Sequence, residues 1–171
     1  MTKTKCVYIG NLAAVAEYMF FTEELEVITI LCEKERITDD LLTFSLLRNI
    51  EIKEVDKEHP IEDYINKIPI DVIFVMCSYG RRVPIEKCEG HKIFNIHYAA
   101  LPNYRGRHPS YWATVNNEKR LGVTMHYVTE KFDDGNIVEQ IFVPYYFWED
   151  ERDIFDKLTK QVPELLKSLV E

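Results

Sequence analysis

The sequence predicts an α/β fold, a single doubly wound domain whose sheet is mixed but mostly parallel. Short runs rich in β-branched residues alternate with segments of helical periodicity, which is the pattern of a parallel sheet covered by helices. Residues 71–77 (DVIFVMC) form a continuous apolar run, typical of a central strand buried on both faces. A chain of 171 residues suits one core, so we expect one domain over residues 1–171 and no additional C-terminal domain.

The first half of the chain alternates regularly between the two kinds of element. Apolar or alternating runs predict strands over residues 6–9, 25–31, 50–55 and 71–77. Helical spacing of apolar residues predicts helices after Asn11, over residues 39–49 and over residues 60–68. Because Asn11 follows the turn at Gly10 and precedes the first helical stretch, it is expected to be the N-cap of that helix.

In the second half of the chain, the regular alternation of strands and helices ends in two consecutive strands. Strands are expected over residues 92–97, 123–128 and 137–144, and residues 111–115 lie in a helical stretch. The last two strands are joined by the short segment TEKFDDGN, which predicts a hairpin and therefore antiparallel strands in a mixed sheet. An amphipathic helix is expected from Ile154 to Leu169, with Pro163 as a kink or boundary.

Composition narrows the classes of function. Acidic residues outnumber basic ones by 29 to 21, and the net charge of −8 disfavours general nucleic-acid binding. No apolar run approaches the ~20 residues of a membrane span, and the N-terminus has no signal-peptide pattern, so we expect a cytoplasmic protein. Scattered positions predict reduced, mostly buried thiols for the cysteines, Cys6, Cys32, Cys77 and Cys88. The first turn carries no dinucleotide-binding or Walker motif.

Asn95 and His97 are the first candidates for chemistry. They lie two positions apart on a predicted strand, so both side chains project from one face near its carboxyl end, where open α/β sheets bind ligands. An amide beside an imidazole can hydrogen-bond a carbonyl oxygen, stabilise an oxyanion or donate a proton. For this pair alone, a strand-end asparagine and a packed core histidine are the simpler explanation.

Two irregular segments supply further candidates. Residues 101–109 (LPNYRGRHP) carry Arg105 and Arg107, whose guanidinium groups match carboxylates or phosphates; the alternative is a solvated loop without a ligand. Residues 132–135 (FDDG) give a strong hairpin-turn signal, and the functional alternative is that one carboxylate reaches His97.

The other histidines do not form a metal pattern. A zinc site of His97, His108 and His126 has no H-E-x-x-H or paired-cysteine spacing, so no metal site is expected. His126 lies within a predicted strand and either packs or lines a cleft. Residues 79–84 follow the buried strand, either as a cleft-lining loop or as a plain connection.

Four short motifs follow one another in the second half of the chain. They are Asn95-Ile96-His97, Leu101-Pro102-Asn103-Tyr104-Arg105-Gly106, Gly122-Val123-Thr124-Met125-His126 and Asp133-Asp134-Gly135-Asn136-Ile137. In this order they resemble N-x-H, L-P-x-Y-R-G, G-x-T-x-H and D-x-G-x-I of the N10-formyltetrahydrofolate-dependent formyltransferases. The resemblance covers residues 71–144 and implies the family's Rossmann-like, doubly wound catalytic domain.

The resemblance also implies roles for residues. Asn95, His97 and Asp133 match the catalytic trio: the amide and the protonated imidazole would steady the oxyanion formed when an amine attacks the formyl carbon, and the carboxylate would assist proton removal. The pterin of the co-substrate N10-formyltetrahydrofolate would lie against Tyr79, Gly80, Arg81, Val83, Pro84, Thr129 and Phe132. The amine substrate would meet Tyr98, Arg105, Gly106, Arg107 and Trp112.

The substrate is less constrained. Residues 105–116 are similar to a motif of the sugar-nucleotide N-formyltransferases, which favours an amino sugar, free or nucleotide-linked, or another small amine, and leaves a homodimer open. The phosphate loop of glycinamide ribonucleotide transformylases is absent from residues 10–13, tRNA is not expected, and Ala99 stands where the family carries serine. The alternatives are a methionyl-tRNA formyltransferase-like enzyme without its C-terminal domain, a formyltetrahydrofolate hydrolase, and a non-catalytic folate-binding relative.

Overall fold

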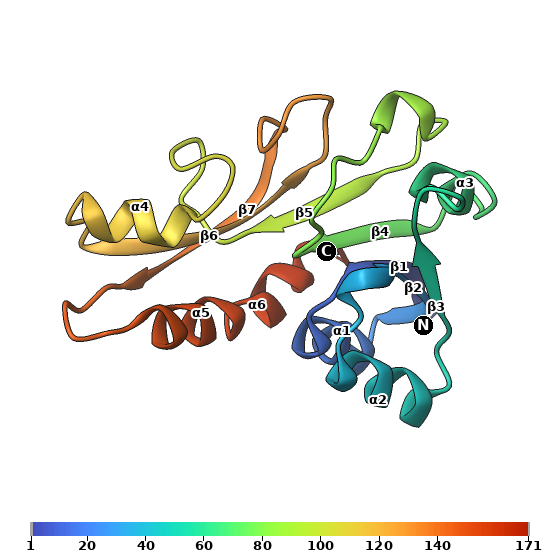
Figure 1. The fold of residues 1–171 in the computed structure, drawn as a ribbon, viewed down its shortest axis with the longest axis horizontal. Coiled ribbons are helices and arrows are strands. Elements are labelled where there is room, and N and C mark those ends of the chain that lie inside the picture. Colours follow the sequence, from blue (N-terminus) through green and yellow to red (C-terminus); the bar gives the residue numbers. More distant parts are fainter. Residues whose placement is uncertain (1, 171) are drawn as a thin grey trace.

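The computed structural model describes residues 2–170 and contains a seven-stranded sheet flanked by helices (Figure 1). The strands are β1 (Thr4–Gly10), β2 (Leu25–Glu33), β3 (Ile52–Val55), β4 (Ile73–Cys77), β5 (Ile93–His97), β6 (Arg120–Tyr127) and β7 (Ile137–Pro144). The α-helices are α1 (Ala13–Phe21), α2 (Asp39–Arg48), α3 (Ile61–Ile65), α4 (Pro109–Val115), α5 (Glu151–Thr159) and α6 (Val162–Lys167). Two short 3-10 helices are η1 (Lys34–Arg36) and η2 (Ile85–Lys87).

The sheet has a parallel part and an antiparallel part. Its strand order is β3-β2-β1-β4-β5-β6-β7. β1 to β5 pair in parallel, whereas β6 runs antiparallel to both β5 and β7. The predicted α/β fold with a mostly parallel, mixed sheet is therefore confirmed, together with each predicted strand and the hairpin between the last two.

Two apolar layers cover the two faces of the sheet. Along β1, Cys6 and Tyr8 join one buried cluster, while Val7 and Ile9 join the other, because successive strand residues point to opposite faces. The first layer includes side chains of α1, α2, α5 and α6, which lie on the same side of the sheet in Figure 1. The second layer packs against α3 and the residues around η2. All four cysteines are buried and free, as predicted.

The start of α1 differs from the expectation. Leu12, not Asn11, is the N-cap residue, and Asn11 Oδ1 is buried without a hydrogen-bond partner among the described residues. The Leu12 N–H donates instead to the Tyr8 hydroxyl at 3.0 Å, and this hydroxyl donates to the carbonyl oxygen of Cys77 at 3.1 Å. A Cβ at Gly10 would lie 1.9 Å from the same oxygen, so only glycine fits there. Contacts between strands, which the local pattern does not encode, therefore fix this helix start.

The expected C-terminal helix is divided into α5 and α6. Pro163 lies in the first turn of α6, which confirms the predicted boundary. Asp150 and Asp153 form a reciprocal capping box that begins α5. The apolar positions of the predicted amphipathic face are buried at Ile154, Leu158, Val162, Leu165 and Leu166. In the part of the chain from 2 to 170, no helix is long and apolar enough to cross a membrane.

Candidate active site

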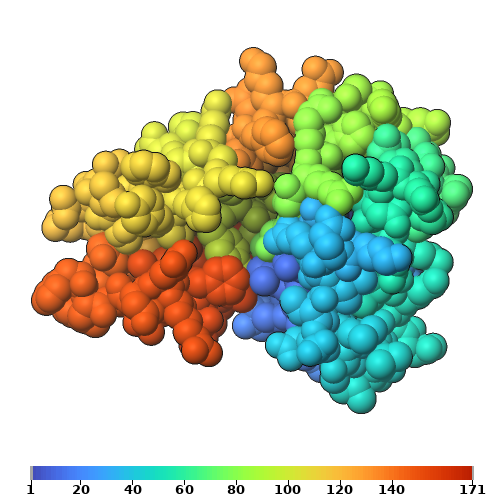
Figure 2. Space-filling view, in the orientation of Figure 1, coloured from blue at the N-terminus to red at the C-terminus, as the bar shows by residue number. Residues whose placement is uncertain are grey.

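A cleft of about 1170 Å³ opens beyond the carboxyl ends of β1, β4 and β5. Its lining comes from segments far apart in the sequence, near residues 35, 80, 97, 110, 130 and 155. In Figure 2, the light-blue, green, yellow and red segments surround a hollow near the centre of the view. This is the edge of the sheet at which open α/β folds bind ligands.

Four polar side chains meet at this cleft. Asn95 and His97 come from β5, His126 lies opposite Asn95 on β6, and Asp133 follows β6. The carboxylate Oδ1 of Asp133 accepts from Asn95 Nδ2 at 3.3 Å, and its Oδ2 lies 3.6 Å from His97 Nε2. The structure thus brings together the three residues that the motifs single out, although they lie up to 38 positions apart. Their catalytic role stays a prediction.

Asp133 is the centre of this cluster. Its side chain is only 9% exposed, and the backbone N–H of Gly106 donates to Oδ2 at 2.9 Å. Burial by itself would raise the pKa of this carboxyl, but the interaction with His126, the charge of His97 and the Gly106 N–H outweigh it. The pKa of Asp133 is therefore lowered, and the carboxylate is ionised at neutral pH.

His126 also belongs to the cluster. The sequence left open whether this side chain packs in the core or lines the cleft, and in the structure it is buried and lines the cleft. The side chain is 2% exposed, lines the cleft and lies 3.4 Å from Asp133 Oδ1. Because a carbonyl oxygen can only accept, His126 Nδ1 donates to Tyr127 O at 2.9 Å, and Nε2 faces both Asn95 Nδ2 at 3.1 Å and Asp133 Oδ1 at 3.4 Å. The amide nitrogen of Asn95 therefore lies within hydrogen-bond distance of both His126 Nε2 and Asp133 Oδ1. The G-x-T-x-H motif was the sequence signal for this residue, and the β5–β6 register places it opposite Asn95.

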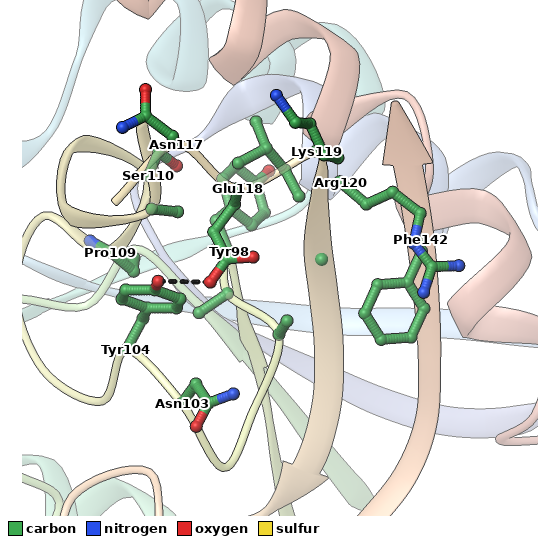
Figure 3. Close-up of a pocket in the computed structure, with 15 residues that line it drawn as sticks. Tyr98, Asn103, Tyr104, Pro109, Ser110, Asn117, Glu118, Lys119, Arg120 and Phe142 are labelled. Atoms are coloured by element: carbon green, nitrogen blue, oxygen red, sulfur yellow. Dashed lines mark hydrogen bonds between the residues drawn. The ribbon is translucent and has the colours of Figure 1, made fainter. Parts of the chain in front are cut away.

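His97 is oriented from the other side. Its Nε2 donates to the carbonyl oxygen of Tyr104 at 3.0 Å. The Tyr104 hydroxyl donates to Glu118 Oε1 at 2.6 Å and accepts from Asn116 Nδ2 at 3.1 Å, and Figure 3 shows the bond to Glu118. Tyr104 therefore links the imidazole to a second set of contacts outside the cleft.

This geometry suits addition of a nucleophile to a carbonyl group. The Asn95 amide and the His97 ring lie at the wall of the cleft, and with Nε2 of His97 bonded to Tyr104 O, Nδ1 is the ring nitrogen left for a ligand. Donors at these positions can stabilise a developing negative charge on oxygen. The ionised Asp133 beside them can accept a proton. Among residues 2–170, no group of three or more His, Cys, Asp or Glu side chains could hold a metal ion.

The residues expected to hold the pterin line one part of the cleft. Most of them are in its wall: Tyr79, Gly80, Arg81, Val83, Thr129 and Phe132. Pro84 lies outside the lining, directly before η2. Met76 and Val128 also line the cleft and add apolar side chains to it.

The residues expected to meet the amine are divided by the structure. Three of them line the cleft: Tyr98, Gly106 and Arg107. Arg105 does not line it, because its Nη1 forms an ion pair with Asp134 Oδ1 at 2.7 Å. Trp112 is 53% exposed and packs edge-on against Tyr111 outside the lining.

Ala99 lies away from the cleft. It is buried and lines a separate cavity of about 280 Å³, shown in Figure 3, next to Tyr104 and Glu118. Its carbonyl oxygen accepts from Thr124 Oγ1 at 2.7 Å. The serine hydroxyl that this position lacks is therefore missing from the smaller cavity and not from the cleft.

Comparison of the sequence with known proteins gives one family. The chain matches the family model described as Formyl transferase over residues 29–170. The methionyl-tRNA formyltransferase of Latilactobacillus sakei subsp. sakei (strain 23K) is 34% identical over 89 residues, which make up 51% of this chain and 28% of that protein. The chain thus matches less than a third of the length of that relative.

Solved structures with the same fold cover nearly all of the chain. The phosphoribosylglycinamide formyltransferase from Bacillus halodurans superposes with a TM-score of 0.80 at 22% identity, over 97% of this chain and 92% of that one. An N-formyltransferase from Helicobacter canadensis, in complex with folinic acid and dTDP-3-aminofucose, superposes with a TM-score of 0.75 at 25% identity, over 99% of this chain and 63% of that one.

Proposed function

The chain belongs to the formyl transferase family, and from this premise we propose that it transfers a formyl group from N10-formyltetrahydrofolate to the amine of a small molecule. The observation that carries the proposal is the meeting of Asn95, His97 and Asp133 at one cleft. Two donors and one ionised carboxylate are the groups that acyl transfer to an amine requires.

Each residue of the cluster has a different role in the proposed reaction. The co-substrate supplies an activated formyl group, whose bond to N10 breaks as the new carbon–nitrogen bond to the amine forms. Asn95 Nδ2 and His97 Nδ1, the ring nitrogen that is not bonded to Tyr104, donate hydrogen bonds to the formyl oxygen while negative charge develops there. Asp133 receives the proton that the attacking amine must lose, and N10 takes up this proton as it leaves. His126 keeps the Asn95 amide turned toward the carboxylate.

The cleft fits a folate in size and chemistry. A volume of about 1170 Å³ holds a bicyclic ring together with an acceptor. The surface formed by Met76, Val83 and Val128 suits the flat faces of a pterin, and the backbone groups at residues 79–83 and 129–132 suit its polar edge.

Charge at the other part of the cleft favours an acceptor with an anionic group. Arg107 lines the cleft and, within residues 2–170, makes no hydrogen bond or ion pair, whereas Arg36 and Arg81 are each paired with glutamates. Tyr98, Tyr111 and Phe155 add aromatic surface to the same part. Arg107 suits a phosphate, and the aromatic side chains suit the sugar or base beside it. The Helicobacter canadensis structure contains a compound of this kind, dTDP-3-aminofucose. We therefore favour an amino sugar linked to a nucleotide.

The test measures tetrahydrofolate release from N10-formyltetrahydrofolate by the purified chain, with a panel of amines that includes nucleotide-linked amino sugars, free amino sugars and methionyl-tRNA. Release with a sugar nucleotide, lost in His97→Ala and retained in His59→Ala, is the expected result, because His59 is exposed and distant in the chain from the cleft residues. Release without any amine indicates a hydrolase, and release only with charged tRNA overturns the assigned acceptor. Folate binding without release in any arm indicates a non-catalytic relative.

A further inference from the structure

Glu33 is a buried carboxylate at the carboxyl end of β2. The residue is only 3% exposed, yet it belongs to none of the motifs and does not take part in the catalytic cluster. Carboxylates are almost never this buried unless they are paired. Its partners therefore indicate why the fold keeps a charge there.

The partners of Glu33 lie on the loop that follows β4. Glu33 Oε2 accepts from the backbone N–H of Gly80 at 2.9 Å and from Arg36 Nη1 at 2.8 Å, while Oε1 lies 3.6 Å from Arg81 Nε. Arg36 Nη2 in turn donates to Ser78 Oγ at 3.2 Å. One carboxylate thus fixes, directly or through Arg36, the three positions 78, 80 and 81, which are 45 or more residues away in the chain.

The shape of this loop depends on that support. Ser78 has a φ of 57°, a left-handed conformation that a serine rarely adopts without external contacts. At Gly80, a Cβ would lie 2.6 Å from Arg36 Nη1 and 2.9 Å from Glu33 Oε1, so the backbone passes directly over the charged groups. Residues 79–83 form the wall of the cleft at which the folate is placed above.

We propose that Glu33 is a positioning residue for the formyl donor: it holds residues 78–81 in the shape that receives the pterin. The inference rests on the proposed function. Two glutamates, Glu33 and Glu35, balance the two arginines, Arg36 and Arg81, so this network carries no net charge for an anionic ligand. The network acts on the shape of the loop backbone, and this shape determines how tightly the formyl donor binds. The chemistry at Asp133 and the acceptor at Arg107 are not part of the network.

The experiment compares Glu33→Gln with Glu54→Gln. Glutamine keeps the volume and an oxygen for the Gly80 N–H, but it loses the charge that holds both arginines. We expect the Kd of 5-formyltetrahydrofolate, measured by calorimetry, and the KM for the donor to rise about 10-fold. This factor corresponds to the loss of one charge-assisted hydrogen bond. The kcat and the KM for the amine stay within about 2-fold. Glu54→Gln removes an exposed partner of Lys34 outside the cleft lining and leaves all four values within about 2-fold.

A second variant keeps the inference testable if Glu33→Gln does not fold. Gly80→Ala places a methyl group against Arg36 and Glu33, leaves every charge in place and should raise the donor Kd in the same selective way. A lower melting temperature with an unchanged Kd in both variants would show a purely structural role and overturn the inference. Failure of the unmodified chain to bind 5-formyltetrahydrofolate overturns the proposed function as well, so the two failures are distinguishable.

Discussion

The two loops that line the cleft are held in place by different kinds of partner. The loop at residues 78–84 is fixed by Glu33 and Arg36, which lie outside the catalytic cluster. The loop at residues 98–109 is fixed by the cluster itself, through Tyr104 O on His97 and the Gly106 N–H on Asp133. The contacts that shape the first loop, where the donor is expected to bind, do not involve Asn95, His97 or Asp133. In the second loop, the same hydrogen bonds that shape the loop also orient the reacting groups.

This difference predicts how substitutions divide between binding and turnover. A change beneath the first loop should alter the KM for the donor and spare kcat, as tested at Glu33. A change in the second loop should alter kcat, because it releases His97 or Asp133 from the orientation in which they act. The predictions below test the second loop, from the largest expected effect to the smallest.

Asp133→Asn should lower kcat by roughly 10²–10⁴-fold, because an amide cannot accept the proton of the amine. The steady-state rate of tetrahydrofolate formation measures this loss. Asp134→Asn is the matched control, since the neighbouring carboxylate pairs with Arg105 outside the cleft, and it should stay within about 3-fold. An Asp133→Asn variant with more than a tenth of the original kcat would contradict the assigned role.

Arg107→Gln should raise the KM for an anionic acceptor about 10-fold, the loss of one charge-assisted contact. The KM for the formyl donor should not change. Arg105→Gln is the control in the same loop, and its ion pair with Asp134 predicts only a small effect on either KM. If the two substitutions raised the KM for the acceptor equally, the ion pair between Arg105 and Asp134 would not determine which arginine binds the acceptor.

Tyr104→Phe should lower kcat several-fold and also lower the free energy of unfolding, because two side-chain hydrogen bonds are lost. The phenol loses its bonds to Glu118 and Asn116, so the carbonyl that holds His97 is less firmly placed. Tyr64→Phe removes a single tyrosine hydroxyl bond, to Glu54 O at 3.0 Å, outside the cleft, and serves as control for the stability change. If both variants lower kcat equally, orientation through Tyr104 is refuted.

The pH dependence of stability should depend on Asp133. Its pKa is lowered in the folded chain, so its contribution to stability is complete above the ordinary aspartate pKa and is lost as pH falls through the lower, folded value. Urea unfolding from pH 6 down to pH 2 should show a smaller acid loss in Asp133→Asn than in the unmodified chain. Parallel pH profiles for the two proteins would be inconsistent with a lowered pKa.

Local patterns in the sequence predicted most of the fold. Strand alternation, the buried run before Ser78 and the turn residues locate all seven strands, because burial periodicity is a property of neighbouring residues. The N-cap assigned to Asn11 was wrong, since the Tyr8 hydroxyl satisfies the Leu12 N–H across a strand end. The same hydroxyl donates to Cys77 O on β4, a contact between strands that no local pattern specifies.

The candidate site shows the same division. The sequence by itself determined which residue types are present at β5 and after β6, and the order of the motifs singled out Asn95, His97 and Asp133. Only the tertiary structure decided that Asp133 reaches the imidazole, because the antiparallel β5–β6 pairing brings the segment after β6 back along β5. It also decided that Arg105 pairs with Asp134, that Arg107 stays free within residues 2–170, and that Glu33 supports the loop after β4. These are contacts between distant segments, and their energies depend on distance and burial, which exist only once the chain has folded.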